Sequence, residues 1–252
     1  MIQILELFGG IGAPRCAFRN LGVDVKSIDY VEIDEKAVRS YNAMFNNDYK
    51  TQSVVGWNLK PDFLIHGSPC QDFSIAGKQK GADEGSETRS SLMWETIKII
   101  KNFGIWKPKV VIWENVKNIR SKYMVHNHTR YMNELYKLGY SSSYELLDAR
   151  DFGIPQARQR YFTVSVLGDK EFNFMNMSKK TMKNINDFLL KNDIPDKYII
   201  KSPSMISRII EDNYDNGSLT KLSIIKNYAM TITTKQNRCP NSGIVKMNNG
   251  KY

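Results

Sequence analysis

The sequence predicts an α/β protein built on a mainly parallel, twisted sheet with helices on both faces. Over residues 1–167, short apolar runs rich in β-branched residues alternate with longer segments that have helical spacing. The first apolar run ends in a glycine-rich turn, and a helical segment follows it. The chain of 252 residues is long enough for one large α/β domain, or for such a domain with a small appendage.

The predicted elements follow one another in a regular order. Strands are expected at residues 2–8, 25–31, 51–55, 63–65, 110–113, 144–147 and 161–167. Helices are expected at residues 13–21, 35–45, 92–103 and 129–138, the second of them capped by Asp34. Residues 71–89 are polar, contain glycine and lack apolar periodicity, so they predict a long loop of the kind that often carries function.

The composition changes after residue 167. Residues 168–252 are rich in lysine and asparagine, have weak periodicity, and contain 14 basic and 8 acidic residues. We therefore expect a separate, irregular region that is the better candidate for a nucleic-acid surface. An equally simple source of this charge, and of the net charge of +10 for the whole chain, is the codon bias of an AT-rich genome.

Several classes of protein are excluded. No run of eighteen apolar residues is present, and the N-terminus lacks the basic region and cleavage site of a secretory signal. The three cysteines, Cys16, Cys70 and Cys239, form no CxxC pair. A disulfide framework and a metal site are therefore not expected, and a reducing cytoplasm is the expected compartment.

The turn after the first strand indicates a ligand site. Gly9, Gly10 and Gly12 allow close approach to the backbone where a helix begins, although their spacing differs from GxGxxG. Glu32 ends the second strand, where an acid is suited to bind a ribose diol. A tight turn and a solvated acid would explain each feature alone, but together they predict a nucleoside-containing cofactor.

Cys70 is the candidate nucleophile. It follows a predicted strand and Pro69, at the start of the long polar loop, where open α/β sheets place their chemistry. Cys16 lies on a predicted helix and is interpreted as a small core residue.

Two further motifs stand next to predicted strands. Glu114 and Asn115 follow the apolar run 110–113, and a carboxyl group among apolar residues suits proton donation near neutral pH. Gln156, Arg158 and Arg160 alternate in an extended segment and are expected to share one side, although an ordinary solvated basic face has the same pattern.

The ordered set FGGIG, the acid after the second strand, PCQ, ENV and QxRxR resembles the cytosine-C5 DNA methyltransferases, from residue 2 to about residue 166. The resemblance implies an S-adenosylmethionine-dependent methyltransferase fold, which is Rossmann-like with one antiparallel strand. It also implies a catalytic and cofactor-binding domain at 1–167 and a target-recognition region at 168–252. The implied partner is duplex DNA, in a bacterial or phage restriction–modification setting.

The resemblance also implies roles for individual residues. Those implied to bind the cofactor are Phe8, Gly10, Gly12, Glu32 on the ribose, Ile33 against the adenine, and Pro69. Those implied to act in catalysis are Cys70, Glu114, Arg158 and Arg160, and those implied to contact substrate or hold the loop are Gln71, Asn115, Gln156 and Arg160. Cys70 would attack C6 of a flipped cytosine while Glu114 protonates N3, and C5 would then accept the methyl group. Residues 72–89 would close over the base, with Lys78, Lys80 and Arg89 near phosphates.

Two departures from the family pattern bear on these expectations. The stretch from Ser53 to Trp57 lacks the acid that usually contacts the adenine amine. Residues 230–252 resemble the lead-in to a closing block and helix, so the sequence predicts a C-terminally incomplete protein. A second polypeptide, an early stop of the sequence, or a truncated gene would each explain this.

Three alternatives remain open at this level. A tRNA cytosine-C5 methyltransferase shares the catalytic motifs, but residues 233–240 lack the Cys-Phe-Thr tripeptide of that subfamily. A non-catalytic DNA-binding remnant is argued against by the presence of Cys70, Glu114, Arg158 and Arg160. One half of a split enzyme is the third.

Overall fold

The computed structural model describes residues 1–56, 60–69, 89–190, 194–210, 221–232, 240, 242–247 and 250–252. The chain forms two compact units. The first unit consists of Met1–Leu146 and Arg160–Met177, and the second of Leu147–Gln159 and Ser178–Tyr252. The expected boundary at residue 167 differs from this division, in which residues 147–159 belong to the second unit. They do so because Gln156–Ala157 pairs with Ala229–Met230. The functional division into a catalytic domain and a target-recognition region stays a prediction.

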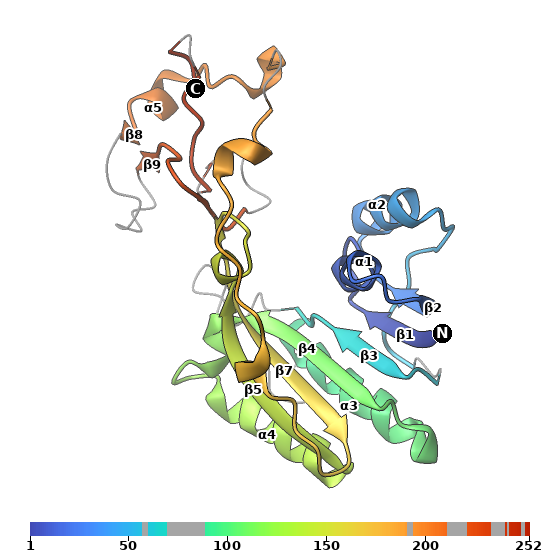
Figure 1. Cartoon of the computed structure of the whole chain (residues 1–252). Coiled ribbons are helices and arrows are strands. Elements are labelled where there is room, and N and C mark those ends of the chain that lie inside the picture. The colour runs from blue at the N-terminus through green and yellow to red at the C-terminus, as the bar shows by residue number, and fades with distance from the viewer. Residues whose placement is uncertain are drawn as a thin grey trace. The chain divides into compact units, whose positions relative to one another are not determined.

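The first unit is built on a six-stranded sheet with the order β2-β1-β3-β4-β7-β5 (Figure 1). The strands are β1 (Ile2–Leu7), β2 (Val25–Val31), β3 (Phe63–His66), β4 (Val110–Val116), β5 (Tyr140–Asp148) and β7 (Gln159–Leu167). β1 runs parallel to β2 and β3, β3 runs parallel to β4, and β7 is antiparallel to β4. The predicted mainly parallel sheet with an antiparallel strand is therefore confirmed.

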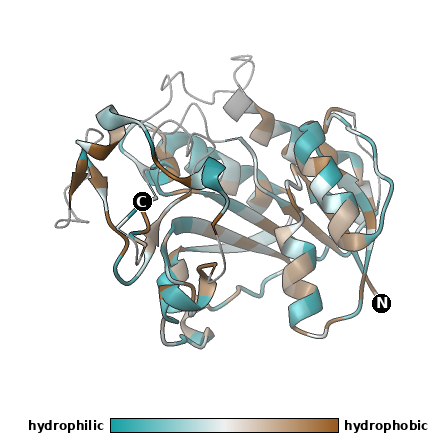
Figure 2. Ribbon diagram, turned by 90° about the horizontal axis from the view of Figure 1, so that it is seen from above, coloured by the Kyte–Doolittle hydropathy of each residue, from teal (hydrophilic) through white to brown (hydrophobic). Residues whose placement is uncertain are grey.

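Helices cover both faces of this sheet, because alternate strand residues point to opposite sides. They are α1 (Ala13–Asn20), α2 (Glu35–Phe45), α3 (Met93–Asn102) and α4 (Val125–Lys137), with 3-10 turns at Arg89–Leu92, Gly104–Trp106, Lys117–Arg120 and Phe174–Asn176. Leu5, Leu64 and Trp113 pack in one core cluster with residues of α3 and α4. Tyr30 packs on the opposite side with Tyr41 of α2. Most helices carry both teal and brown residues in Figure 2, as expected of helices that cover one side of a sheet.

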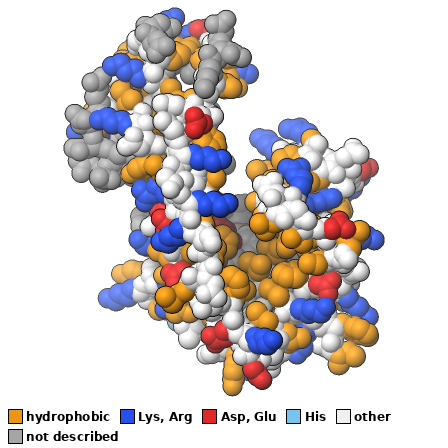
Figure 3. Space-filling view, viewed as in Figure 1, with side chains coloured by type: hydrophobic (Ala, Val, Ile, Leu, Met, Phe, Trp, Pro, Cys, Tyr) orange, Lys and Arg blue, Asp and Glu red, His pale blue; other side chains and the backbone are white. Residues whose placement is uncertain are grey.

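Part of the sheet face on the α1 side is only half-buried. Phe63, Ile112 and Phe162 alternate with core residues on their strands and therefore lie on this face, where Phe63 contacts Phe18 of α1 edge to face. Figure 3 shows hydrophobic side chains gathered over this part of the first unit.

Four predicted elements are absent or differ from the structure by more than two residues at one end. No strand forms at residues 51–55, where Ser53 Oγ accepts the N–H of Val55 in a local turn that competes with strand pairing. β4 continues to Val116 instead of ending at residue 113, so Glu114 and Asn115 lie within the strand. β5 begins at Tyr140 instead of residue 144, because the serines at 141–143 hide the apolar alternation and hydrogen-bond to neighbouring segments. α4 begins at Val125, four residues before the predicted start.

The described residues of the second unit form short elements. β6 (Gln156–Ala157) pairs in parallel with β10 (Ala229–Met230), and β8 (Ile209–Ile210) pairs with β9 (Leu222–Ser223). The helical pieces are α5 (Pro203–Ile206) and 3-10 turns at Ala149–Asp151, Ile185–Phe188 and Asp196–Tyr198. Among the described residues of both units, no helix is long and apolar enough to cross a membrane, and no group of three potential metal ligands is present.

Candidate active site

The glycine turn after β1 has an unusual backbone. Phe8, Gly10 and Gly12 have φ angles of 53°, 54° and 83°, all in the left-handed region. Gly12 precedes α1 as its N-cap residue, and a Cβ at this position would lie 2.5 Å from the ring of Phe45. The sequence therefore needs glycine at residue 12 for both its φ angle and the space that the aromatic ring leaves.

Glu32 joins this turn to the end of β2. Its Oε2 accepts the N–H of Gly10 at 2.9 Å, and its Oε1 accepts the N–H groups of Ile33 and Asp34 at 2.8 and 2.9 Å. The side chain of Ile33, directly after Glu32, is 76% exposed. The acid and the apolar residue expected to bind a nucleoside thus lie together beside the glycine turn.

Next to the turn, on β1, lies Glu6, which is not among the site residues predicted from the sequence. Its carboxylate is fully buried and accepts the hydroxyl groups of Tyr41 at 2.6 Å and Ser27 at 3.2 Å. Burial raises the pKa of Glu6 above its ordinary value, and the hydrogen bonds from Tyr41 and Ser27 only partly oppose this. A charged residue between the apolar Leu5 and Leu7 is the signal that marks this position.

The end of β3 and the middle of β4 lie side by side. His66 is paired with Trp113 in parallel register, so the residues that follow His66 run next to Glu114 and Asn115. A Cβ on Gly67 would lie 3.6 Å from Glu114 Oε2. Pro69 is half-buried, whereas Cys70, Gln71, Lys78 and Lys80 lie outside the described residues, as do nearly all residues of the expected lid at 72–89.

Glu114 forms an ion pair with Arg160. The distance between Arg160 Nε and Glu114 Oε1 is 3.0 Å, and the two side chains are 18% and 33% exposed, respectively. The structure therefore brings together two of the four predicted catalytic residues. Asn115 is buried, and its Nδ2 lies 3.5 Å from both the carbonyl oxygen and Oγ of Ser68.

Gln156 and Arg158 lie in the second unit, while Arg160 belongs to the first. The expected single extended segment is divided between β6 and β7, with Arg158 between the two strands. The Arg158 carbonyl accepts the N–H of Ala149, and the Ala157 carbonyl accepts the Thr231 hydroxyl group at 2.9 Å.

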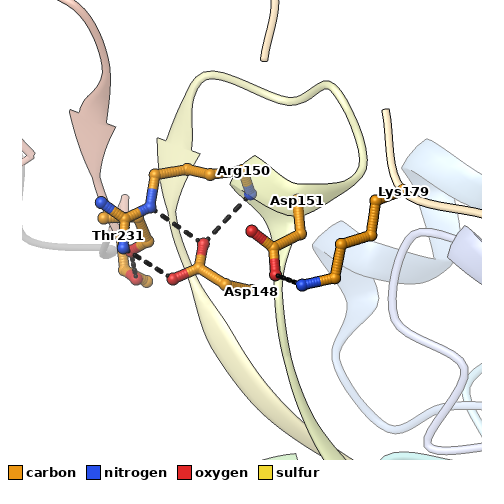
Figure 4. A network of polar contacts seen from close by, with 6 residues as sticks. Asp148, Arg150, Asp151, Lys179 and Thr231 are labelled. Atoms are coloured by element: carbon orange, nitrogen blue, oxygen red, sulfur yellow. Dashed lines mark hydrogen bonds and ion pairs between the residues drawn. The ribbon is translucent and has the colours of Figure 1, made fainter. Parts of the chain in front are cut away.

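Ionic contacts hold the 3-10 turn Ala149–Asp151 of the second unit (Figure 4). Arg150 donates to both carboxylate oxygens of Asp148, and Lys179 contacts Asp151 at 3.0 Å. The Arg150 guanidinium group also lies 4.8 Å from the ring centroid of Tyr228. The segment that carries Gln156 and Arg158 is thus held by several contacts within its own unit.

The strand order, the antiparallel β7 and the glycine turn define an α/β methyltransferase fold. A solved structure of the Entamoeba histolytica methyltransferase EhMeth is similar, with a TM-score of 0.74 and 20% identity over 94% of this chain and 72% of that one. The chain belongs to the C-5 cytosine-specific DNA methylase family, whose sequence model matches residues 2–251. This match confirms the predicted family and enzyme class.

Curated relatives support the same family. The chain is 30% identical over 272 residues to the type II methyltransferase M2.ScrFI of Lactococcus lactis subsp. cremoris, a match that covers 85% of this chain and 74% of that protein. It is 35% identical over 179 residues to the type II methyltransferase M.NlaX of Neisseria lactamica, covering 69% of this chain and 55% of that protein. Neither these comparisons nor the described residues support a second polypeptide.

Proposed function

We propose that this chain transfers a methyl group from S-adenosylmethionine to C5 of a cytosine in a short duplex DNA site. The observation that carries this proposal is the Glu114–Arg160 ion pair next to Gly67, three residues before Cys70. An acid held by a guanidinium group, beside the segment that leads into a cysteine, is suited to act on a base that the cysteine attacks. The match to a C-5 cytosine-specific DNA methylase family supports DNA as the substrate, and the relatives named type II methyltransferases support methyl transfer.

The residues around the glycine turn fit the cofactor. Gly10 has open space around its backbone, and Gly12 gives the turn its left-handed backbone against Phe45 and Tyr41. Glu32 supplies a carboxylate for the ribose, and the exposed side chain of Ile33 offers an apolar surface for the adenine. Phe8 and Pro69 complete the proposed pocket. When bound, S-adenosylmethionine supplies an electrophilic methyl group, and the residues named here bind and orient it. Because the stretch from Ser53 to Trp57 contains no acid where the family usually has one, the adenine amine is not expected to meet a carboxylate there.

The proposed reaction proceeds through a covalent bond between Cys70 and the cytosine. The Cys70 thiolate forms a bond to C6 of the cytosine while Glu114 gives a proton to N3, which makes C5 nucleophilic. C5 then takes the methyl group, which leaves S-adenosylhomocysteine, and loses its own proton to a base. The C6–sulfur bond breaks to release the thiolate, and the N3 proton returns to Glu114. Arg160 holds the carboxyl group of Glu114 and is the proposed contact for the cytosine O2, while Arg158 steadies the cysteine loop.

Access to C6 requires that the cytosine leave the base stack, because a stacked base hides this atom from a thiol. Gln71, Asn115 and Gln156 are the proposed supports of the loop and the displaced base, and residues 168–252 are proposed to read the DNA site. The basic excess of this region suits phosphate contacts. The bacterial relatives support a role in restriction–modification in the cytoplasm.

The proposal is tested by methyl transfer from labelled S-adenosylmethionine to mixed-sequence duplex DNA, with tRNA as a parallel substrate and Cys70→Ala as the control. Label in DNA that disappears in the variant is the expected result. Label in tRNA alone would replace the DNA proposal with the tRNA alternative. Absence of label in both, from a chain shown to bind S-adenosylmethionine, would contradict catalysis by this chain and favour a DNA-binding remnant.

A further inference from the structure

A buried polar network lies directly under the start of the segment that carries Cys70. Ser68, two residues after the end of β3 and two before Cys70, is 4% exposed. Its Oγ accepts the indole N–H of Trp113 at 3.0 Å and lies 3.5 Å from Asn115 Nδ2. Both partners belong to β4, so two side chains of the neighbouring strand hold this one hydroxyl group.

Neighbouring rings hold the indole of Trp113 in place. Its indole ring is 2% exposed and lies between two imidazole rings, with centroid distances of 5.7 Å to both His66 and His128 and interplanar angles of 4° and 19°. The ring of Tyr131 packs against it at 4.4 Å. Because the indole cannot rotate within this stack, its N–H has a fixed direction, and that direction determines where Ser68 Oγ lies.

The two histidines are themselves fixed by hydrogen bonds. His66 Nε2 lies 2.8 Å from the Tyr131 hydroxyl group and Nδ1 lies 3.4 Å from Thr96 Oγ1. His128 Nε2 lies 3.4 Å from Thr163 Oγ1. The network therefore extends from α3 and α4 to side chains on the adjoining face of the sheet. It ends at Ser68, the residue before Pro69 and Cys70.

We propose that Trp113 is a positioning residue for the methyl-transfer reaction, acting through its hydrogen bond to Ser68 to fix the start of the Cys70 segment. This inference rests on the proposed function, because it assigns a purpose to the segment that Cys70 occupies. An alternative purpose for Trp113 is core packing alone, which needs the ring and not its N–H. The two purposes are separable because phenylalanine keeps an aromatic ring in the stack and removes only the donor and part of the ring area.

The test compares Trp113→Phe, Ser68→Ala and the double variant, with Trp106→Phe as the matched control. Trp106 is 57% exposed and lies in a 3-10 turn after α3, so it carries the same chemical change outside the network. Both single changes remove the Trp113–Ser68 hydrogen bond, and Ser68→Ala also removes the 3.5 Å contact with Asn115. The kcat is therefore expected to fall about fivefold in Trp113→Phe, at least as far in Ser68→Ala, and in the double variant no further than in Ser68→Ala. The KM for S-adenosylmethionine is expected to stay within about twofold, since Trp113 is not among the proposed cofactor residues.

A second readout does not depend on turnover. The rate at which iodoacetamide alkylates Cys70, followed on its own peptide by mass spectrometry, is expected to change in both single variants. In the double variant it is expected to change by the same factor as in Ser68→Ala. Losses that multiply in the double variant, or an alkylation rate unchanged in all three, would overturn the proposal. If wild-type protein transfers no methyl group, the proposed function fails, and the alkylation series still decides whether Trp113 and Ser68 act as one unit.

Discussion

Arg160 reaches diagonally across the β4–β7 pair to Glu114, with 3.0 Å between Arg160 Nε and Glu114 Oε1. Arg160 is paired with Val116, two residues beyond Glu114, so both side chains lie on the same face of the sheet. The antiparallel strand β7 is therefore the element that brings a cation to the predicted acid. A parallel strand in its place would enter the sheet from the opposite end and would not place Arg160 here.

Replacement of the acid should nearly abolish turnover. Glu114→Gln keeps the size and polarity of the side chain but removes the exchangeable carboxyl proton, so kcat is expected to fall about 10²- to 10⁴-fold. Steady-state methyl transfer to DNA measures this, with Glu171→Gln, at an exposed position, as the control. A Glu114→Gln protein that keeps more than a tenth of wild-type kcat would show that another group protonates the base.

Arg160→Lys tests whether charge alone is sufficient at this position. Lysine keeps the positive charge but lacks the planar fork that fixes a carboxylate, so kcat is expected to fall about tenfold to a hundredfold. Arg39→Lys, exposed on α2, is the matched control. Equal kcat in Arg160→Lys and wild type would mean that the carboxyl group of Glu114 needs only a nearby positive charge.

Gly12→Ala should destabilise the first unit. Its φ of 83° disfavours any other residue, and the new methyl group would meet Phe45 at 2.5 Å and Tyr41 at 2.6 Å. We expect a loss of about 2 to 4 kcal/mol in the free energy of unfolding, measured by urea denaturation. Gly22→Ala separates strain from crowding, because Gly22 has a φ of 67° with open space around it, and its expected loss is only about 1 kcal/mol.

Acid should destabilise the protein through the buried histidines. Burial lowers the pKa of His66 to about 3, and burial together with Arg120 lowers that of His128 to about 4, from 6.5 in the unfolded chain. Below pH 6.5 the unfolded chain binds protons that the folded chain does not, so each histidine reduces stability by about 1.4 kcal/mol per pH unit of acidification.

Glu6 has the opposite effect on how stability depends on pH. Because burial raises its pKa above 4.5, Glu6 favours the folded state at acidic pH, and this contribution to stability is lost as the pH rises. The comparison of wild type with His128→Gln cancels the effect of Glu6. At pH 7 the variant is expected to have the lower free energy of unfolding. By pH 4.5 this difference in free energy of unfolding should be smaller by about 2 kcal/mol. Urea unfolding at several pH values measures this difference, with His126→Asn at an exposed position of α4 as the control. A difference in free energy of unfolding that is independent of pH would contradict the neutral state of His128 in the folded chain.

The parts of the fold that local patterns determine were predictable from the sequence. β2 and α2 have the predicted bounds, because apolar spacing and the Asp34 cap are local signals, and Asp34 does accept the N–H of Lys36. The strand expected at residues 51–55 is absent because Ser53 Oγ accepts the N–H of Val55 in a local turn, which the apolar pattern does not show. The roles of Glu6 and Ser68 could not be predicted, since their partners Tyr41 and Trp113 stand 35 and 45 residues away.

Glu32→Gln tests the proposed cofactor site and the bracing of the glycine turn at once. The Glu32 carboxylate accepts three backbone N–H groups, whereas a glutamine amide has one accepting oxygen and would leave part of this set without an acceptor. Calorimetric titration with S-adenosylmethionine is expected to give a Kd about tenfold to a hundredfold higher than wild type, as for the loss of hydrogen bonds to a charged group. Glu35→Gln, three residues further along and exposed, is the matched control. If the Kd is unchanged while the unfolding temperature falls, Glu32 only holds the turn to β2, and the ribose must be bound by other groups.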